Sequence, residues 1–399
     1  MTNRIHFAFM CAGHFFVHLF MLVFATVAAL TLLQEWGMSY AELIPYATPG
    51  FIALGVCAVP AGWLADKWSR KGMMILFFMG IGLSSIFASF AQTPLRMSIA
   101  LLAIGVFASI YHPVGISLVV QGRKTTGIPL AVNGVFGNMG VACAALITGF
   151  LIDNSGWRSA FVWPGVVSFL IGIAYAGFLY VTRYSDTENA RNNAEKKITS
   201  KKISMEKRLL RRVFTIIFFS TAIGGLIFQS TTFALPKMFD EQLAELAVSA
   251  TSVGWYTFIV FAFAAIGQLI VGYLLDRYSI RAVFSFVAAL QAVFLGIMPG
   301  HSGVSALVIA TAFMLVVFGQ IPINDVLIGR VTQSEWRSRA YAFRYIVTFS
   351  VSASSIPFIA WIHYRWGFNS LFIVLSVAAV LIFFSVLMLP NTLSEKRSM

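Results

Sequence analysis

Long apolar runs separated by short polar gaps make up most of this chain. A membrane-spanning helix needs roughly 20 mostly apolar residues, and the sequence contains twelve runs of that kind. The first six lie near residues 6–33, 43–65, 73–91, 98–121, 129–153 and 160–182. The second six lie near residues 212–236, 250–275, 281–299, 305–329, 339–362 and 369–389. The pattern predicts an all-α membrane protein with twelve transmembrane helices.

One long polar segment separates the two sets of runs. Residues 183–211 are rich in Lys, Arg, Asn and Ser, a composition typical of a flexible or partly helical linker. We therefore predict an N-terminal six-helix bundle over residues 1–182, a cytoplasmic linker over 183–211, and a C-terminal six-helix bundle with a short cytoplasmic tail over 212–399.

The two halves share a repeated motif. The sequence GWLADKWSRK at residues 62–71 returns as GYLLDRYSIR at residues 272–281, which is 210 positions later. A second pair, GWRSAF from residue 156 and GFNSLF from residue 367, repeats at an offset of 211. Parallel six-helix repeats with pseudo-symmetry are typical of transporters, which bind their substrate between the halves near the bilayer midplane.

Composition and charge agree with a membrane location. Hydrophobic residues make up 59% of the chain and charged residues 11%, against about a quarter charged in soluble domains, so a lipid bilayer must cover much of the surface. If both termini are cytoplasmic, 23 of the 28 basic residues lie in cytoplasmic segments, four (Arg96, Arg158, Lys237 and Arg365) lie outside, and Arg344 falls inside a helix. This asymmetry predicts a multi-pass protein of the bacterial inner membrane with both termini in the cytoplasm. The net charge of +13 then reflects topology, and no nucleic-acid partner is expected.

The first copy of the motif resembles the signature loop between helices 2 and 3 of the major facilitator superfamily. The matching residues are Gly62, Leu64, Ala65, Asp66, Arg70 and Lys71, and the second copy keeps Gly272, Leu274, Asp276, Arg277 and Arg281. The resemblance implies the twelve-helix fold of that family. It also implies conformational gating by Asp66 and Arg70, and by Asp276 and Arg281, at the cytoplasmic helix ends. The alternative is that these charges only set the topology.

A narrower resemblance lies in helices 4 and 5. The segments YHPVG at 111–115, Gly122-Arg123 and NGVFGN at 133–138 resemble the fosmidomycin-resistance branch of proton-driven drug or metabolite exporters. That branch tends to carry an acidic residue about four positions after a histidine in helix 1, where this chain has His14 and His18. The resemblance, with the glycines of helix 5, implies an antiporter.

Histidines are the main ionisable residues in the first-half runs. His14 and His18 are four apart and share one face of helix 1, and His112 lies in the middle of helix 4. The family resemblance implies that helices 1 and 4 line the cavity, so we expect all three to approach it. An unperturbed histidine changes charge between about pH 5 and 8, which suits proton coupling. The alternatives are a neutral, hydrogen-bonded histidine or a transition-metal site. Because no carboxylate or thiolate with ligand spacing lies nearby, we predict neither a metal nor a cofactor.

In the second half the intramembrane charges are Asp325 in helix 10 and Arg344 in helix 11. Their similar depth predicts an ion pair, since neither charge is stable alone in a low-dielectric region. The pair could serve gating or proton coupling, Arg344 could bind an anionic group of the substrate, or the pair could be structural. Four amide side chains complete the candidate substrate and coupling set: Asn133, Gln229, Gln320 and Asn324.

No Gly-x-x-x-x-Gly-Lys-Ser/Thr segment occurs, so ATP is not the expected driver, and no catalytic cluster predicts an enzyme. The sequence therefore predicts a monomeric secondary transporter that moves a small organic solute by alternating access, as proton-coupled export. A proton-coupled transporter of an anionic metabolite or a metal chelate is the alternative. A non-transporting membrane sensor or enzyme is the distant one.

Overall fold

The computed structural model describes residues 2–123, 126–182, 207–331 and 334–390. Secondary structure in this part of the chain is helical throughout. Eleven of its helices are long and apolar enough to cross a membrane. The last, residues 346–387, has 42 residues, which is about 63 Å at 1.5 Å per residue and twice the roughly 30 Å hydrocarbon core. Gly367 interrupts it with non-helical angles, φ 75° and ψ −177°. It therefore comprises two spans, and the predicted twelve-helix architecture is confirmed.

The chain divides into two compact units. The first contains Met1–Met38, Tyr46–Thr199 and Ser249–Gly254, and the second contains Ser39–Pro45, Ser200–Val248 and Trp255–Met399. Residues 183–206 of the predicted linker lie outside the described residues. Its last five residues, 207–211, belong to helix α12.

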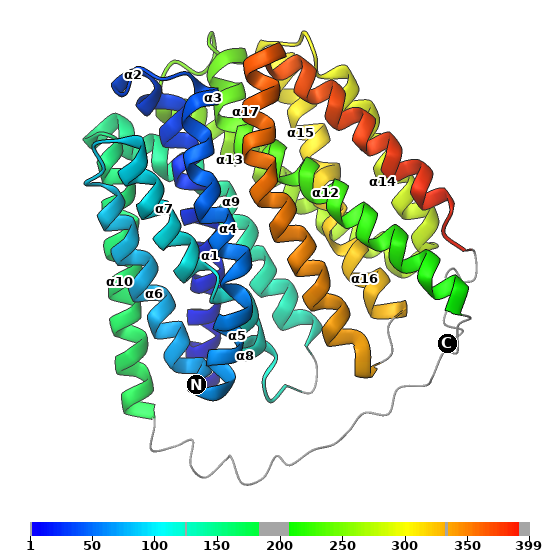
Figure 1. Cartoon of the computed structure of the whole chain (residues 1–399), viewed down its shortest axis with the longest axis horizontal. Coiled ribbons are helices and arrows are strands. Elements are labelled where there is room, and N and C mark those ends of the chain that lie inside the picture. Colours follow the sequence, from blue (N-terminus) through cyan, green and yellow to red (C-terminus); the bar gives the residue numbers. More distant parts are fainter. Residues whose placement is uncertain (1, 124–125, 183–206, 332–333, 391–399) are drawn as a thin grey trace. The chain divides into compact units, whose positions relative to one another are not determined.

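Apart from residues 39–45, the first unit contains the helices of the first six spans (Figure 1). Their bounds are α1 Thr2–Val27, η1 Ala28–Leu32, α2 Leu33–Glu35, α4 Thr48–Val56, α5 Ala58–Lys67, α6 Arg70–Ala88, α7 Pro94–Ala108, η3 Tyr111–Gly115, α8 Ile116–Val120, α9 Gly127–Ser155 and α10 Trp157–Thr182. The short η2, Ile44–Ala47, runs across the boundary between the units.

The second unit contains the remaining helices. Their bounds are α3 Tyr40–Leu43, α12 Lys207–Gln242, α13 Ala250–Arg277, α14 Ile280–Ile297, α15 Gly303–Gly319, α16 Ile321–Val331 and α17 Ser334–Leu387. The first residues of α13 are grouped with the first unit.

Glycines allow several helix pairs of the first unit to pack closely. A Cβ on Gly82 of α6 would lie 2.5 Å from the carbonyl oxygen of Gly165 in α10, and a Cβ on Gly165 would lie 2.8 Å from that of Gly82. A Cβ on Gly140 of α9 would overlap the carbonyl oxygen of Phe15 in α1. Without a hydrophobic force between helices in lipid, such close backbone packing is a main source of helix association.

The segments at the starts of α3 and α13 repeat one capping arrangement. The Ser39 hydroxyl accepts a hydrogen bond from the Glu42 amide at 3.3 Å, and the Ser249 hydroxyl accepts one from the Ser252 amide at 3.2 Å. In the first unit, the Asp153 carboxylate at the end of α9 also accepts from the Thr251 amide at 2.7 Å, where the helix dipole favours a negative charge. Ser39 and Ser249 are 210 positions apart, so the repeat seen in the motif includes these caps.

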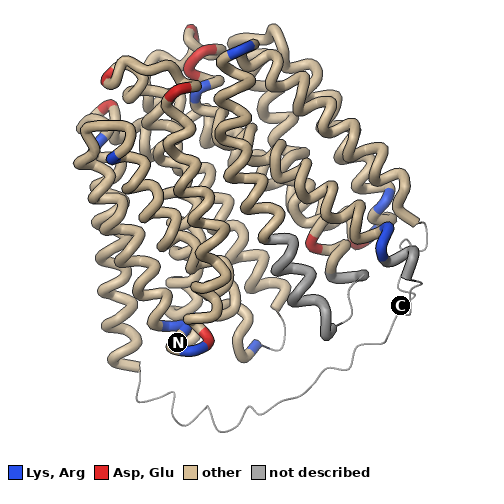
Figure 2. Tube along the Cα trace, in the orientation of Figure 1, with Lys and Arg blue, Asp and Glu red and all other residues tan. Residues whose placement is uncertain are grey.

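Charged residues in the described part of the chain lie mostly near the helix ends, and the long middle sections of the helices contain very few (Figure 2). Burying an isolated charge in hydrocarbon is costly, so this distribution is expected for helices that cross a bilayer.

Candidate functional site

The structure brings three histidines of the first unit together. His14 and His18 lie on one face of α1, and His112 lies in η3. Their ring centroids are 5.1 Å apart for His14 and His18, 5.7 Å for His14 and His112, and 5.6 Å for His18 and His112. All three side chains are half-buried. We call these three residues the imidazole cluster.

A π-helical turn carries His112. The segment Tyr111–Gly115 is a π-helix within the fourth span, and such turns occur often at functional sites. Pro113 has no backbone N–H, so the regular hydrogen-bond ladder is interrupted at this turn. A Cβ on Gly62 of the repeated motif would lie 3.3 Å from Pro113 Cβ, so the first motif residue packs against this turn.

Asn133 of α9 fixes the orientation of His14. His14 Nδ1 lies 2.8 Å from the Asn133 carbonyl oxygen and 2.9 Å from its side-chain oxygen. Both atoms are acceptors, so His14 Nδ1 carries the proton and donates it. The Asn133 side-chain amide donates to the Tyr111 hydroxyl at 2.9 Å, and that hydroxyl donates to the Met10 carbonyl at 2.8 Å. These roles are mutually consistent, and in the neutral form of His14 they leave Nε2 as the lone-pair nitrogen.

Two groups lie against the His14 ring. The Tyr111 ring stacks on it at 4.9 Å with an interplanar angle of 26°. A Cβ on Gly137 would lie 2.6 Å from His14 Nε2 and 2.8 Å from both Cδ2 and Cε1. Such similar distances place Gly137 over the ring face near Nε2, because an atom in line with the lone pair would be much farther from the two carbons. The lone-pair direction of Nε2 is therefore not covered by Gly137.

The second unit has a buried amide network rather than a histidine cluster. Gln320 and Asn324 are 4% and 5% exposed. The Gln291 amide of α14 donates to the Gln320 side-chain oxygen at 2.8 Å, and the Ser220 hydroxyl of α12 lies 3.2 Å from the Asn324 side-chain oxygen. The predicted residue Gln229 is 6% exposed and lies on α12.

Sequence reasoning did not select Ser220, Gln291 or Tyr111. Gln291 is a polar residue within the apolar run of α14, and that signal was sufficient to include it. Ser220 and Tyr111 are common inside membrane helices, so only their contacts reveal their part in these networks.

The predicted ion pair in the second unit is only partly described. Asp325 lies on α16 and is half-buried. Arg344 falls within α17, but its side chain lies outside the described residues. The pairing of Asp325 with Arg344 therefore stays a prediction.

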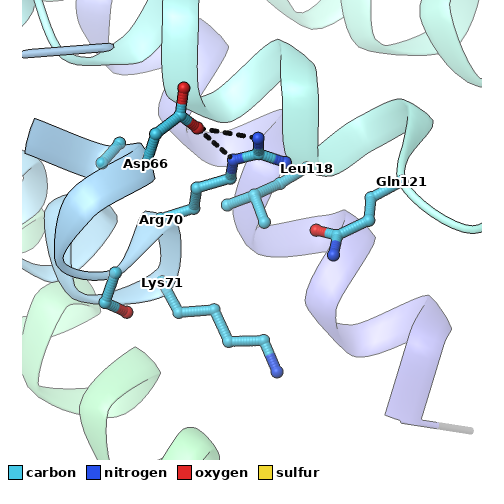
Figure 3. Close-up of a pocket in the computed structure, with 7 residues that line it drawn as sticks. Asp66, Arg70, Lys71, Leu118 and Gln121 are labelled. Carbon is cyan, nitrogen blue, oxygen red and sulfur yellow. Dashed lines mark hydrogen bonds and ion pairs between the residues drawn. The ribbon is translucent and has the colours of Figure 1, made fainter. Parts of the chain in front are cut away.

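In the first copy of the motif, Asp66 and Arg70 pair with each other. The Asp66 carboxylate accepts from Arg70 Nη2 at 2.8 Å and from Nε at 3.1 Å, as Figure 3 shows. With Lys71, they line a shallow depression of about 300 Å³ that also includes Gln121. The side chains of Asp66 and Arg70 are 64% and 42% exposed, so this ion pair adds little stability.

The two copies of the motif share a serine cap. The Ser69 hydroxyl accepts from the Gly72 amide at 3.0 Å, and the Ser279 hydroxyl accepts from the Ala282 amide at 3.2 Å. A serine therefore caps the start of the next helix in both halves. The second copy has isoleucine at position 280, where the first has Arg70. Asp276 is exposed, and Arg281, which follows that isoleucine, is half-buried.

These features define a twelve-helix membrane protein with a few buried polar clusters inside its spans. The sequence matches the Major Facilitator Superfamily over residues 10–244 and 238–398, so the chain belongs to that family. The membership confirms the family predicted from the repeated motif, and it confirms that the chain is not an enzyme. The narrower resemblance to the fosmidomycin-resistance branch stays a prediction.

Three relatives share about a quarter of their aligned residues with this chain. The gallate transporter of Pseudomonas putida is 23% identical over 286 residues, which cover 65% of this chain and 63% of that protein. The 4-hydroxybenzoate transporter PcaK of Pseudomonas putida is 25% identical over 293 residues, covering 65% and 64%. The probable sulfoacetate transporter SauU of Cupriavidus necator is 21% identical over 290 residues, covering 69% and 65%. The chain thus matches just under two thirds of the length of each relative.

Among solved structures, the chain resembles a POT family transporter crystallised with 5-aminolevulinic acid. The TM-score is 0.74 at 12% sequence identity, and the match covers 98% of this chain and 96% of the other. At this identity the likeness shows the fold alone.

Proposed function

We propose that this chain is a secondary active transporter that moves a small organic acid, in its anionic form, across the bacterial inner membrane by alternating access. The observation that carries the proposal is the chemistry shared by the named relatives. Gallate, 4-hydroxybenzoate and sulfoacetate are small compounds that carry an acid group. This supports the anionic-metabolite alternative over export of a drug-like compound.

Proton coupling belongs to the same proposal, with Asp325 as the group that carries the proton. A carboxylate within a membrane-spanning segment is costly, and such groups commonly serve proton or ion pathways. Asp325 is half-buried on α16, next to Asn324 and its contact with Ser220. The direction of transport by a secondary transporter follows the gradients imposed on it. One assay with the pH gradient imposed in each direction therefore tests both the predicted export and proton-driven entry.

The proposed orientation has both termini in the cytoplasm. It is supported by the excess of Lys and Arg in the segments that would then face the cytoplasm, because such an excess sets the orientation of multi-pass proteins. The repeated motifs would then lie on the cytoplasmic side.

Reconstituted vesicles test the transport proposal. Purified protein in liposomes should accumulate labelled gallate or 4-hydroxybenzoate when a pH gradient is imposed, and should not accumulate the uncharged 4-hydroxybenzyl alcohol. If no acid in the panel moves with either direction of the gradient, the proposal is wrong.

The role of Asp325 needs its own variant. Asp325→Asn should lose gradient-driven accumulation by at least tenfold and keep exchange of labelled for unlabelled acid, because exchange needs no net proton movement. Glu245→Gln is the matched control, since Glu245 is an exposed carboxylate outside the spans. Equal losses of accumulation and exchange in Asp325→Asn would contradict the coupling role.

A further inference from the structure

We propose that the imidazole cluster binds one divalent transition-metal ion, with Zn²⁺ as the representative ion, through one nitrogen from each of His14, His18 and His112. The three candidate ligand atoms all lie within 4.8 Å of one another. They come from two segments of the first unit that are almost a hundred residues apart in the chain. No part of this inference depends on which solute the protein transports.

The distances fit a metal site after small side-chain adjustments. Zinc binds imidazole nitrogen at about 2.0–2.1 Å in tetrahedral geometry, so two ligand nitrogens on one ion are about 3.4 Å apart. From separations of at most 4.8 Å, the nitrogens need to approach one another by no more than about 1.4 Å.

The surroundings of His14 provide a second, independent observation. A histidine that binds a metal usually donates its other ring N–H to a carbonyl or carboxylate, which fixes the tautomer and raises the basicity of the ligand nitrogen. His14 donates its Nδ1–H to the two Asn133 oxygens, so Nε2 is the available ligand atom. Gly137 lies against the ring face and does not itself cover the lone-pair direction of Nε2.

The donor set selects the class of metal. Three neutral imidazoles suit Zn²⁺, Co²⁺, Ni²⁺ and Cu²⁺, whereas Mg²⁺ and Ca²⁺ prefer oxygen ligands. No carboxylate or thiolate lies at ligand spacing in the sequence, which is why the sequence alone predicts no metal site. Three imidazoles are a complete set of protein ligands for zinc, as in sites that keep a fourth position open.

An ion in the imidazole cluster would bring two positive charges into the membrane-spanning part of the first unit. Among the described residues of that unit, the lysines and arginines lie at helix ends or in loops. The open fourth coordination position of the ion would then accept a water molecule or an anionic oxygen.

Metal binding can be measured without transport. Full-length protein, purified in detergent through a tag that contains no histidine and then stripped with a chelator, is titrated with Zn²⁺ by calorimetry and with Co²⁺ by absorption. We expect one ion per chain, the visible absorption of tetrahedral Co²⁺, displacement of Co²⁺ by Zn²⁺, and no binding of Mg²⁺.

Variants connect the binding to the imidazole cluster. His18→Gln and His112→Gln should each weaken Zn²⁺ binding by at least 100-fold. Asn133→Ala should weaken it about 10–100-fold, as loss of such a hydrogen bond does in other sites. His301→Ala is the matched control, because His301 is exposed in the loop between α14 and α15, and it should bind like the wild type.

Thermal unfolding of each variant in the presence of a chelator shows whether the fold is retained. The inference is overturned if wild-type protein gives no tetrahedral Co²⁺ absorption. It is also overturned if a folded His18→Gln/His112→Gln double variant still binds one Zn²⁺ with wild-type affinity. Failure of the transport assay would affect neither measurement, so the two proposals fail separately.

Discussion

Replacing Gly137 with alanine tests the packing on which the imidazole cluster depends. The new Cβ would lie 2.6 Å from His14 Nε2, which is closer than two such atoms can approach. His14 has little room to move, because Tyr111 stacks on it and Asn133 holds its Nδ1. The ring must therefore shift and lose its hydrogen bond, or α9 must move away from α1.

Gly134 provides a matched control on the same helix. A Cβ there meets nothing within 4 Å, so Gly134→Ala carries only the helix-propensity gain, up to about 1 kcal/mol. Gly137→Ala carries the same gain but adds about 1–3 kcal/mol for overpacking and about 0.5–1.5 kcal/mol for the lost hydrogen bond. The free energies of unfolding of the two variants should then differ by about 1.5–4.5 kcal/mol.

Equilibrium unfolding in mixed detergent micelles, followed by circular dichroism, measures this difference. Gly137→Ala should unfold at a lower denaturant fraction than wild type, and Gly134→Ala at an equal or higher one. If the two variants agree within about 0.5 kcal/mol, a typical surface-substitution effect, the His14 ring does not lie against Gly137 and the reasoning fails.

Two further predictions concern the repeated motif. Ser69→Ala and Ser279→Ala should each lower the free energy of unfolding by about 1 kcal/mol, because each removes a helix cap. In the same unfolding assay, Ser69→Asp should be as stable as the wild type, because aspartate also caps helices. An unchanged free energy of unfolding in either alanine variant would contradict the capping role. Asp66→Asn should change the free energy of unfolding by less than about 1 kcal/mol, because the pair with Arg70 is exposed, yet reduce the exchange rate in vesicles at least fivefold if Asp66 gates transport. Wild-type exchange in that variant would mean that the charge only sets the topology.

The sequence was sufficient to predict the helical architecture. Spans of about 20 apolar residues follow from the thickness of the bilayer, and this constraint acts locally along the chain. The break at Gly367 also agrees with the sequence, because the repeated GFNSLF segment places a helix start there. The serine caps at 69 and 279 follow from residue type alone once the repeat is seen.

The sequence also limited the candidates for the site, because ionisable and amide residues are rare within apolar runs. It paired His14 with His18 through the four-residue spacing, which is a local property of a helix. It did not select Ser220, since the importance of this residue comes from its contact with another helix and not from its residue type.

Hydropathy determined which segments of this chain are membrane helices, because burial in lipid depends on the composition of each segment. It did not determine how each helix is rotated about its axis, because in lipid that rotation depends on close packing against neighbouring helices. Only the tertiary structure brings His112 to His14 and His18, since this requires a π turn at Pro113, a glycine at position 137 and the Asn133 hydrogen bonds together. The sequence by itself therefore determined the family and the fold, and the packing of α1, η3 and α9 decided that three separate histidines lie together in one cluster.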